Sequence, residues 1–588
     1  MNLSAIFHRC SDNYCYCLNE DEIVISIKTG YDVKRVYLCY GDPFTRGIMG
    51  SNQTFEEKED LMSQRKNLDY HILWTHKVKP EFKRLVYYFK IEDDTDTYYM
   101  MEDKFYSPSE LHSFKGRRQA FMFPWMNPAD IITVPKWVNS TIWYQIFVER
   151  FCNGNKKINP ENTSEWRSSD KKVKYHEFFG GDLPGIISKI PYLENLGITG
   201  LYLTPVCESP SNHKYDITNY SKIDPCFGTD EDMINLVSTA HNHGIKVMMD
   251  GVFNHSGMLF APWQDVLKKG PESKYFHWFM INKWPLINDG KYGNAKECRM
   301  YSFAFYDQMP KLNTNNPSVI DYIVNIVSDW VKKYDIDALR LDVAGEISHL
   351  LCKELNKALK SIKPDFYIIG ELWHDSIPWL RGDQYDSVMN YAFGDSLNNF
   401  WSDETSCSES LEHSINRCYS LYPEQMNEVL FNLLDSHDTM RLMTWVINIY
   451  AFYQQLTMLF TMPGTVCIYY GTEIALKGSY DPDCRRCMPW DEINTGKHYR
   501  KYSVIKKLIN LRKEYACLRS NNYQFVIIPE NPRIIQYDRF DSEGKKITVI
   551  LNCSNDDYSY SVHKNNILFS LKYEKKTLKP NGILISLS

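Results

Sequence analysis

The chain has 588 residues, of which 43% are hydrophobic and 24% are charged, and its formal net charge is −6 at pH 7. This length exceeds what one hydrophobic core supports, so we expect roughly two to four domains. The acidic balance gives no basic surface for nucleic acid, and no apolar run reaches the roughly 18 residues that a membrane span needs. The sequence therefore predicts neither a nucleic-acid partner nor a membrane segment.

Cysteine usage indicates the compartment. Residues 1–10 lack the charged start and the long apolar run of a secretion signal. The 16 cysteines are therefore expected to be reduced thiols, and we expect a cytoplasmic protein. Cys484 and Cys487 form a CxxC pair, but no second pair stands at zinc spacing, so we interpret them as ordinary loop thiols.

Residues 1–133 have the pattern of an N-terminal β-sandwich. Short apolar runs, such as residues 23–27, 36–40 and 85–91, are separated by turns rich in Gly, Pro, Asp and Asn. Prolines at 124, 128 and 135 then mark a linker to the next domain.

From about residue 140 the pattern changes to strands that alternate with helices. The best defined helix is expected from Pro317 to Tyr334 with Asn316 as its N-cap, and another opens at Thr229 with Asp232 in a capping box. Eight candidate strands cover residues 142–151, 198–205, 245–253, 336–343, 366–372, 387–391, 429–434 and 465–470. This alternation predicts a (β/α)8 TIM barrel over residues 134–500, with a doubly wound open sheet as the alternative.

Two further segments complete the multidomain chain. Residues 254–312, between the third strand and the Pro317 helix, are too many for a barrel loop and are rich in aromatics, so we expect a small inserted domain. Residues 501–588 carry a helix at 503–514, and then β-like runs at 524–528, 534–537, 547–551 and 583–587. They predict a C-terminal β domain.

Ionisable residues end four of the predicted strands: Asp250, His255, Arg340, Asp342, Glu371, His437 and Asp438. The carboxyl ends of barrel strands meet at one face, where barrel enzymes carry their chemistry. By themselves Arg340 and Asp342 fit a buried structural ion pair equally well. Stability alone does not require several acids in one place, because like charges repel. We therefore interpret the four strand ends together as a catalytic site.

The residue types indicate the chemistry of this site. No Ser-His-Asp, Cys-His, HExxH or clustered-Cys pattern is present. Paired carboxylates without a metal predict glycosidic cleavage, in which one acid donates a proton and the other attacks or activates water. Asp342 beside Arg340 is expected to stay ionised, Glu371 to donate the proton, and Asp438 to steady the transition state. His255 and His437 are expected to donate hydrogen bonds to sugar hydroxyls.

Four segments resemble the α-amylase family of retaining glycoside hydrolases, in the order of that family: DGVFNH at 250–255, LRLDVA at 339–344, GELWH at 370–374 and LLDSHD at 433–438. MPKLN at 309–313, NHKYD at 212–216 and the preceding β-rich domain are similar to the neopullulanase, cyclomaltodextrinase and maltogenic amylase group. The resemblance implies that Asp342 is the nucleophile, Glu371 the acid/base and Asp438 the transition-state stabiliser. It also implies substrate-binding roles for six residues: Tyr215, Asp250, His255, Arg340, Trp373 and His437.

The implied activity is cleavage of α-1,4 and also α-1,6 bonds in cyclodextrins, pullulan or maltooligosaccharides, with water or a sugar hydroxyl as acceptor. An oligo-1,6-glucosidase or a glucosyltransferase of the same family is the alternative, although MPKLN and the added N-terminal domain speak against it. A more remote alternative is a catalytically silent sugar-binding protein. Such proteins usually lose the acids, and this chain retains all three.

The group often binds a structural calcium near the first strand. The implied ligands here are Asn153, Asn155, Asn159, Gly180 and Asp182. Asn155 stands where the group usually has Asp, and Lys156 and Lys157 add positive charge, so we expect weak calcium binding.

Two other positions depart from the group. Gly345 replaces an Asn near the acceptor side, which bears on the balance between hydrolysis and transfer. Members of the group also dimerise, with the N-terminal domain lining the partner's active site. The resemblance therefore implies a homodimer, although Arg46 stands where relatives often have an aromatic residue.

Overall fold

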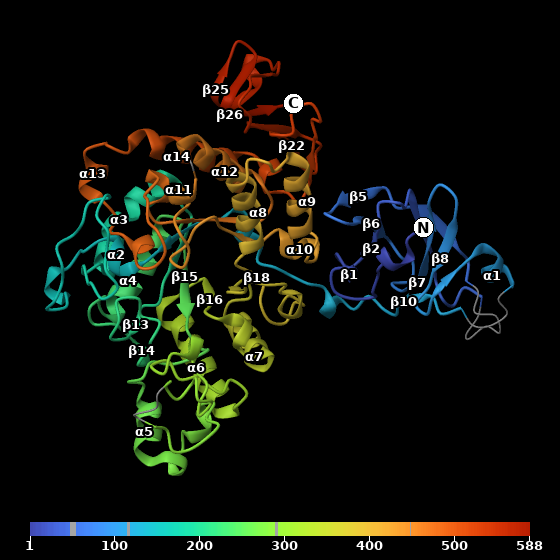
Figure 1. The fold of residues 1–588 in the computed structure, drawn as a ribbon. Coiled ribbons are helices and arrows are strands. Elements are labelled where there is room, and N and C mark those ends of the chain that lie inside the picture. Colours follow the sequence, from blue (N-terminus) through green and yellow to red (C-terminus); the bar gives the residue numbers. More distant parts are fainter. Residues whose placement is uncertain (47–54, 114–117, 288–291, 447) are drawn as a thin grey trace. The chain divides into compact units, whose positions relative to one another are not determined.

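The computed structural model describes residues 1–46, 55–113, 118–287, 292–446 and 448–588. The chain divides into two compact units (Figure 1). The first consists of Met1–Thr133, Leu380–Gly382 and Ser406–Asn427, and the second of Val134–Trp379, Asp383–Thr405 and Glu428–Ser588. The barrel and the C-terminal sheet therefore belong to one unit.

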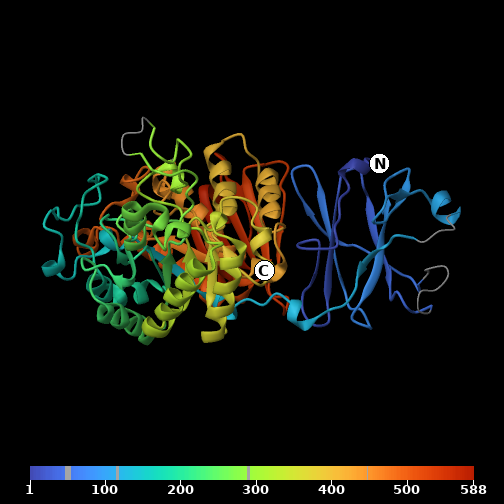
Figure 2. The same cartoon turned by 90° about the horizontal axis from the view of Figure 1, so that it is seen from below.

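The first unit is built on a sandwich of antiparallel sheets, which appear as separate layers in Figure 2. One sheet has the order β1 (Cys15–Cys17), β2 (Ile23–Thr29), β6 (Ile72–Val78) and β5 (Gln64–Asn67). The other has the order β4 (Lys58–Leu61), β3 (Arg35–Gly41), β7 (Leu85–Glu92), β8 (Thr97–Met100) and β9 (Phe105–Tyr106), with β10 (Phe121–Phe123) paired to β7. Side chains such as Ile25, Leu38 and Phe89 fill the core between them. The predicted sandwich is confirmed.

Two short helices also belong to the first unit, although the sequence analysis assigned their residues to the barrel region. They are α9 (Ser408–Cys418) and α10 (Glu424–Asn427). The Asn416 side-chain amide donates to the Asn67 carbonyl at 2.9 Å, and Lys77 Nζ lies 2.8 Å from a Glu424 carboxylate oxygen. The remaining α-helix among the described residues of this unit is α1 (Pro108–Ser113).

The second unit is centred on a parallel sheet of eight strands. Their order is β18 (Ser387–Val388), β17 (Tyr367–Gly370), β16 (Ala338–Leu341), β15 (Lys246–Gly251), β12 (Gly200–Leu203), β11 (Ile142–Ile146), β20 (Thr465–Tyr469) and β19 (Phe431–Asn432). A parallel bridge between Met389 and Phe431 links the two ends of this order and nearly closes the ring. The predicted barrel is therefore confirmed, and the open doubly wound alternative is excluded.

Helices connect the barrel strands. They include α2 (Val148–Phe151), α3 (Leu183–Leu196), α4 (Asp230–Asn242), α6 (Pro317–Tyr334), α7 (His349–Ile362), α8 (Tyr391–Ser402), α11 (Leu442–Trp445), α12 (Ile449–Thr461) and α13 (Trp490–Asn494). Helix α4 starts with the expected capping box, in which Thr229 and Asp232 accept each other's backbone N–H. Helix α6 has the expected bounds, and the Asn316 side chain accepts from Ser318 N.

The inserted segment forms a small lobe between β15 and α6 (Figure 1). It contains α5 (Ala261–Lys269) and three single helical turns at Gly270–Glu272, Phe276–Trp278 and Phe303–Phe305. Trp263 is fully buried against Phe279, with 4.6 Å between the ring centroids. The aromatic content that predicted this lobe thus supplies its small core.

The C-terminal domain begins after α14 (Tyr499–Glu514). Its sheet has the order β21 (Tyr523–Phe525), β22 (Ile534–Phe540), β23 (Lys546–Asn552), β26 (Thr577–Leu587) and β24 (Tyr558–Ser559), with β25 (Ile567–Glu574) paired to β26. The Gln454 amide of α12 donates to the Asn552 and Gly582 carbonyls, and Thr461 bonds the Tyr537 hydroxyl. The barrel helix α12 is therefore tied to the C-terminal sheet by buried polar contacts.

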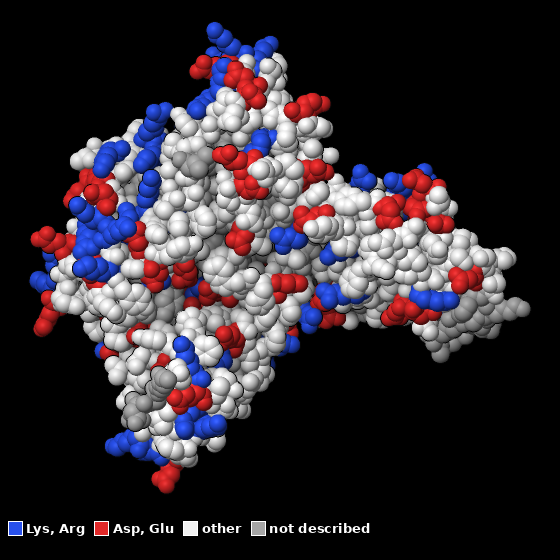
Figure 3. Space-filling view, in the orientation of Figure 1, with Lys and Arg blue, Asp and Glu red and all other residues white. Residues whose placement is uncertain are grey.

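The surface carries charges of both signs, and the cysteines are free thiols. On the face shown in Figure 3, acidic and basic residues are interspersed rather than gathered by sign. Within the described ranges, no helix combines the length and apolarity needed to cross a lipid bilayer. The 16 cysteines all lie in the described part of the chain and carry free thiols.

Candidate active site

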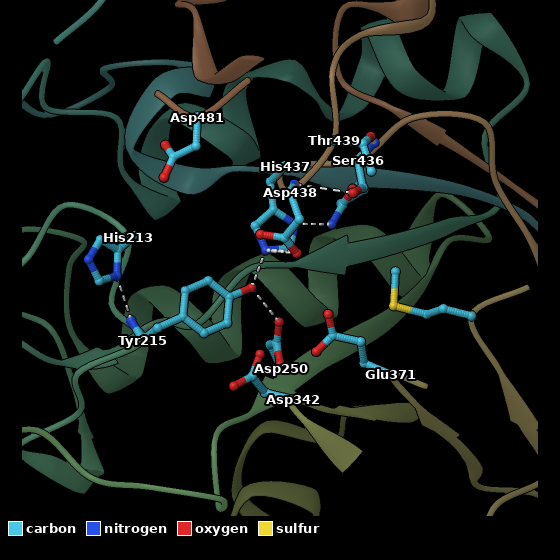
Figure 4. A network of polar contacts seen from close by, with 12 residues as sticks. His213, Tyr215, Asp250, Asp342, Glu371, Ser436, His437, Asp438, Thr439 and Asp481 are labelled. Carbon is cyan, nitrogen blue, oxygen red and sulfur yellow. Dashed lines mark hydrogen bonds and ion pairs between the residues drawn. The ribbon is translucent and has the colours of Figure 1, made fainter. Parts of the chain in front are cut away.

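Three neighbouring strands, β15, β16 and β17, supply the centre of the site. Asp250 of β15 and Arg340 of β16 occupy paired positions in the parallel ladder. Asp342 follows the end of β16, and Glu371 follows the end of β17. Asp438 reaches the same region from the segment after β19, as Figure 4 shows. The strand ends that were singled out from the sequence thus meet at one mouth of the barrel.

The Arg340 guanidinium is shared by three carboxylates. Its Nη1 lies 2.8 Å from Asp250 Oδ1 and 2.9 Å from Asp342 Oδ1, and its Nη2 lies 2.9 Å from Glu371 Oε2. The Arg340 side chain is completely buried, so these ion pairs offset the cost of removing its charge from water. Asp342 and Glu371 therefore lie on the same side of the ring, against adjacent nitrogens of one cation.

The electrostatics of this cluster differ from the expectation for Asp342. Burial raises the pKa of the Asp342 carboxyl well above its usual range, and the Arg340 charge only partly opposes this effect. Burial likewise raises the pKa of Asp250 to about 6. We had expected Arg340 to keep Asp342 ionised, but one cation shared among three acids compensates each of them incompletely. Asp250 and Asp342 therefore titrate as a coupled pair.

Glu371 is held by donors on both oxygens. The backbone N–H of Val343 donates to Oε2 at 2.9 Å, and the Trp373 indole N–H donates to Oε1 at 3.2 Å. Val343 has φ 46° and ψ 42°, a left-handed conformation that is costly for a β-branched residue. This strained turn directly after Asp342 aims the Val343 N–H at Glu371.

His437 has a defined tautomer. The Gln145 side-chain amide donates to His437 Nδ1 at 2.8 Å, so the ring proton is on Nε2. That nitrogen lies 2.6 Å from the Tyr215 hydroxyl and 3.1 Å from Asp438 Oδ2. Burial lowers the pKa of His437 well below its usual range, so the imidazole is neutral at pH 7. His437 therefore connects the Tyr215 ring to Asp438.

Tyr215 lies flat against His437, with an interplanar angle of 1° and 5.4 Å between ring centroids. Its hydroxyl donates to Asp250 Oδ2 at 3.0 Å. The preceding Lys214 has φ 63°, and its Nζ lies 2.7 Å from the buried Asp224 carboxylate. This buried ion pair holds the loop that presents the Tyr215 ring.

His255 donates its Nε2–H to the Tyr215 backbone carbonyl at 3.1 Å and stacks on Phe303 at 5.1 Å between centroids. Burial lowers the pKa of His255 to about 3, so this side chain is also neutral. The Nε2 proton of His255 is therefore engaged in a hydrogen bond to a backbone carbonyl in this structure. A hydrogen bond from His255 to a sugar hydroxyl stays a prediction.

A cavity of about 590 Å³ opens over these residues. Six of the residues predicted from the sequence line it: Tyr215, His255, Asp342, Glu371, Trp373 and Asp438. Asp250, Arg340 and His437 are not among the lining residues and lie behind them, where they hold the lining side chains in place. The cavity is large enough for several sugar units, in the usual size range for small-molecule sites.

Sequence reasoning missed several residues of the site. Arg485 places its Nη2 3.4 Å from Asp438 Oδ1 and its Nη1 3.0 Å from Asp481 Oδ1, and both Asp481 and Arg485 line the cavity. The acids and arginines in the segment after β20 were the available indication. Gln145, which orients His437, was visible as one polar residue in the apolar strand β11.

The CxxC thiols have no catalytic surroundings. Cys484 and Cys487 are both buried, and burial raises their pKa values to about 12 and about 11. Cys484 Sγ donates to the His437 carbonyl at 3.2 Å. In the part of the chain that the structure describes, no cluster of three or more His, Cys, Asp or Glu side chains could hold a metal. The two thiols are packing residues.

The backbone segments that carry the five candidate calcium ligands pack together after β11, although the Asn155 side chain accepts from Lys157 N. Asn153 Nδ2 donates to Asn159 Oδ1 at 3.1 Å, and a Cβ at Gly180 would lie 2.5 Å from both side chains. Asp182 caps α3 and accepts the backbone N–H groups of Gly154, Asn155 and Gly185. Asn153 Oδ1 is buried without a hydrogen-bond partner among the described residues. Oxygen donors suit calcium, but the one carboxylate already accepts three N–H groups, so the residues fit a weak site.

Fold and site together define a barrel enzyme whose chemistry is carried by carboxylates, the arrangement of a glycoside hydrolase. Comparison with known proteins gives the family. Residues 145–521 match the family model of the alpha amylase catalytic domain, and residues 1–127 match that of the alpha amylase N-terminal ig-like domain. The chain belongs to the alpha-amylase family of glycoside hydrolases.

Relatives cover nearly the whole chain. A maltogenic alpha-amylase of Bacillus acidopullulyticus is 40% identical over 561 residues, which are 95% of this chain and 92% of the relative. A cyclomaltodextrinase of Geobacillus thermopakistaniensis (strain MAS1) is 41% identical over 566 residues, with coverage of 95% and 92%. The solved structure of a cyclomaltodextrinase superposes with a TM-score of 0.89 at 34% identity, and each chain is covered completely.

Proposed function

We propose that this protein is a retaining α-glucan hydrolase of the neopullulanase, cyclomaltodextrinase and maltogenic amylase group. Its substrates are cyclodextrins, pullulan and short maltooligosaccharides, in which it cleaves α-1,4 and also α-1,6 bonds. One observation carries the proposal: Asp342 and Glu371 each lie 2.9 Å from a nitrogen of the same Arg340 guanidinium, on the wall of one cavity. Relatives named maltogenic alpha-amylase and cyclomaltodextrinase support the substrate class.

The proposed reaction is a double displacement. Glu371 donates a proton to the glycosidic oxygen while the Asp342 carboxylate attacks the anomeric carbon, so that a glycosyl-enzyme ester forms. Glu371 then removes a proton from water or from a sugar hydroxyl, which attacks the ester and releases Asp342. Asp438 stabilises the positive charge that develops at the anomeric centre in both steps.

The central test is the Asp342→Asn variant with β-cyclodextrin as substrate. We expect kcat to fall about 10³-fold or more, because the amide cannot form the ester. Asp321→Asn is the matched control, since Asp321 is exposed on α6 and does not line the cavity. Full cyclodextrin hydrolysis by folded Asp342→Asn protein would overturn the assignment. A wild-type protein that binds glucans without cleaving them would instead support the silent sugar-binding alternative.

The linkage preference is tested with pullulan. Chromatography of a digest distinguishes the cuts, because panose, isopanose and maltotriose each come from a different bond. We expect panose or isopanose as the main product, which means cleavage of α-1,4 bonds. A protein that leaves pullulan and cyclodextrins intact but releases glucose from α-1,6-linked oligosaccharides would favour the oligo-1,6-glucosidase alternative.

We also propose weak calcium binding at the cluster of Asn153, Asn155, Asn159, Gly180 and Asp182. The support is a set of neutral oxygen donors around one carboxylate that is already hydrogen-bonded. A chelator is expected to change the melting temperature little at micromolar calcium, whereas Asn155→Asp should add a calcium-dependent increase, because calcium prefers anionic ligands. A sharp fall in the wild-type melting temperature on chelation would contradict the proposal.

A homodimer and a cytoplasmic location complete the proposal. The homodimer rests on the resemblance to the group, and the location rests on the free thiols. Light scattering coupled to size-exclusion chromatography should give twice the mass of the 69.2 kDa chain. A monomeric mass at the concentration used for the activity assays would contradict the proposed homodimer.

A further inference from the structure

Two thiols meet one tyrosine hydroxyl inside the N-terminal sandwich, in a part of the molecule that the glycosidase proposal does not use. The Tyr87 hydroxyl oxygen lies 2.9 Å from Cys10 Sγ and 3.3 Å from Cys15 Sγ. Both thiols therefore contact the same oxygen atom, and Cys10 Sγ also donates to the Met122 carbonyl at 3.0 Å. Cys15 belongs to β1 and Tyr87 to β7, so the contact spans both sheets of the sandwich.

A histidine completes this cluster. His8 Nδ1 lies 2.7 Å from the Ser26 carbonyl oxygen, which only accepts hydrogen bonds, so Nδ1 carries the proton. His8 Nε2 therefore accepts, and the Tyr87 hydroxyl donates to it at 2.9 Å. His8 and the two thiols therefore contact the same hydroxyl group.

The two cysteines differ in access. Cys15 is 3% exposed and Tyr87 is completely buried, whereas Cys10 is only partly buried. A small reagent from solvent therefore meets Cys10 first. The hydrogen bond with Cys15 and the proximity of His8 lower the pKa of Cys10 to about 5, while the same bond raises the pKa of Cys15. These surroundings suit an attacking thiolate beside a resolving thiol.

We propose that Cys10 and Cys15 form a hydroperoxide-reactive pair that closes to an intramolecular disulfide. The Cys10 sulfur attacks the outer oxygen of the hydroperoxide, the O–O bond breaks, and the alkoxide or hydroxide that leaves takes up the proton that the Cys10 thiol gives up. Cys10 is then a sulfenic acid. The Cys15 sulfur attacks the Cys10 sulfur, the S–O bond breaks, and the thiol proton leaves with the hydroxide as water.

The chemistry is independent of the glycosidase site. Cys10 and Cys15 belong to the first compact unit, whereas Asp342 and Glu371 belong to the second. Cyclodextrin hydrolysis and disulfide formation are therefore measured separately, and either proposal can fail without the other. Cys17 provides a matched control, because it is a buried thiol of the same strand that makes no hydrogen bond to the Tyr87 hydroxyl among the described residues.

The experiment treats the full-length protein with hydrogen peroxide, blocks remaining thiols with N-ethylmaleimide under denaturing conditions, and maps peptides by mass spectrometry. We expect the peptide with Cys10 and Cys15 to lose two hydrogens and both alkylation sites, and dithiothreitol to restore them. Cys17→Ser should behave as wild type. Cys15→Ser should stop at a sulfenic acid on Cys10 that dimedone traps.

The role of the hydroxyl is tested by Tyr87→Phe, with the melting temperature as the check on folding. We expect Cys10 oxidation to slow roughly tenfold, the effect of losing one hydrogen bond to a charged group. The exposed Cys298 is an internal comparator for reactivity set by exposure alone. Oxidation of Cys298 ahead of Cys10, or a Cys10 that stays reduced while other thiols are oxidised, would overturn the proposal.

Discussion

Arg340 and Asp250 face each other across neighbouring strands, with Arg340 Nη1 2.8 Å from Asp250 Oδ1 and both side chains completely inaccessible to solvent. Asp250 does not line the cavity. It holds the guanidinium at a place where the same Nη1 also donates to Asp342 and Nη2 lies 2.9 Å from Glu371 Oε2. Asp250 is therefore a positioning residue that acts through Arg340.

Replacing Arg340 with Met should be strongly destabilising. The change leaves Asp250, Asp342 and Glu371 without their shared cation, and removing one partner of a buried ion pair costs about 3–5 kcal/mol. Urea unfolding monitored by circular dichroism measures the loss. Arg500→Met, at an exposed position of α14, is the control. A loss below about 1 kcal/mol would contradict a stabilising role for the shared cation.

The pH profile should show an acid limb at a higher pH than ordinary aspartates give. Burial raises the pKa of Asp342 and brings that of Asp250 to about 6, so the coupled acids bind protons as the pH falls through this range and the nucleophile is lost. Measurement of kcat/KM for β-cyclodextrin from pH 4 to pH 8 checks this. A constant kcat/KM down to pH 4 would contradict it.

The stability contribution of Asp250 has the opposite dependence on pH. Its pKa in the folded protein lies above the value in the unfolded chain, so folding favours the protonated form. This contribution is fully present below about pH 4 and is lost as the pH rises through about 6. Comparing unfolding free energies of wild type and Asp250→Asn across this range isolates it. A wild-type to variant difference that stays constant with pH would argue against a shifted Asp250.

Trp373 should contribute through its ring and its N–H separately. The indole is 56% exposed, donates to Glu371 Oε1 and stacks on Tyr391. Trp373→Phe should lower kcat by up to about tenfold, the worth of one hydrogen bond, with KM unchanged. Trp373→Ala should also raise KM about three- to tenfold through loss of the aromatic contact. Tyr499→Ala, at an exposed position on α14, is the control. Equal kinetics for Trp373→Phe and Trp373→Ala would exclude a role for the aromatic ring.

Lys214 should matter for stability and for substrate binding. Lys214→Met leaves the buried Asp224 carboxylate unpaired and should cost about 3–5 kcal/mol of unfolding free energy. KM should rise as well, because Tyr215 follows Lys214 in the chain. Lys222→Met is the control, since Lys222 is largely exposed. If Lys214→Met combined with Asp224→Asn is no more stable than Lys214→Met alone, the buried charge is not the cause.

The barrel was predictable because most of its strands lie in largely apolar runs, the pattern of a parallel sheet buried on both faces. The ends of the strands were less predictable. The strand expected over 142–151 ends at Ile146, because Val148–Phe151 forms the helical turn α2 and all four of its side chains are buried. A buried turn and a buried strand have the same composition. β25 was missed because Ser, Lys and Glu interrupt its apolar residues.

The site was predictable as far as its residues follow their own strands. Asp342 and Glu371 stand at strand ends, so the topology alone brings them together. Arg485 and Gln145 touch His437 and Asp438 from parts of the chain far away in sequence, and no local pattern indicates such a contact. The sharing of Arg340 among three acids was likewise a property of the assembled barrel.

The polar contacts of α12 bear on how the enzyme can be shortened. A chain that ends after the barrel helices would lack β23 and β26. The Gln454 amide would then lose its two carbonyl acceptors, and Thr461 would lose the Tyr537 hydroxyl. Each stranded donor carries a penalty of about 1–3 kcal/mol. A minimal catalytic fragment must therefore run through β26, and trimming for crystallisation belongs elsewhere in the molecule.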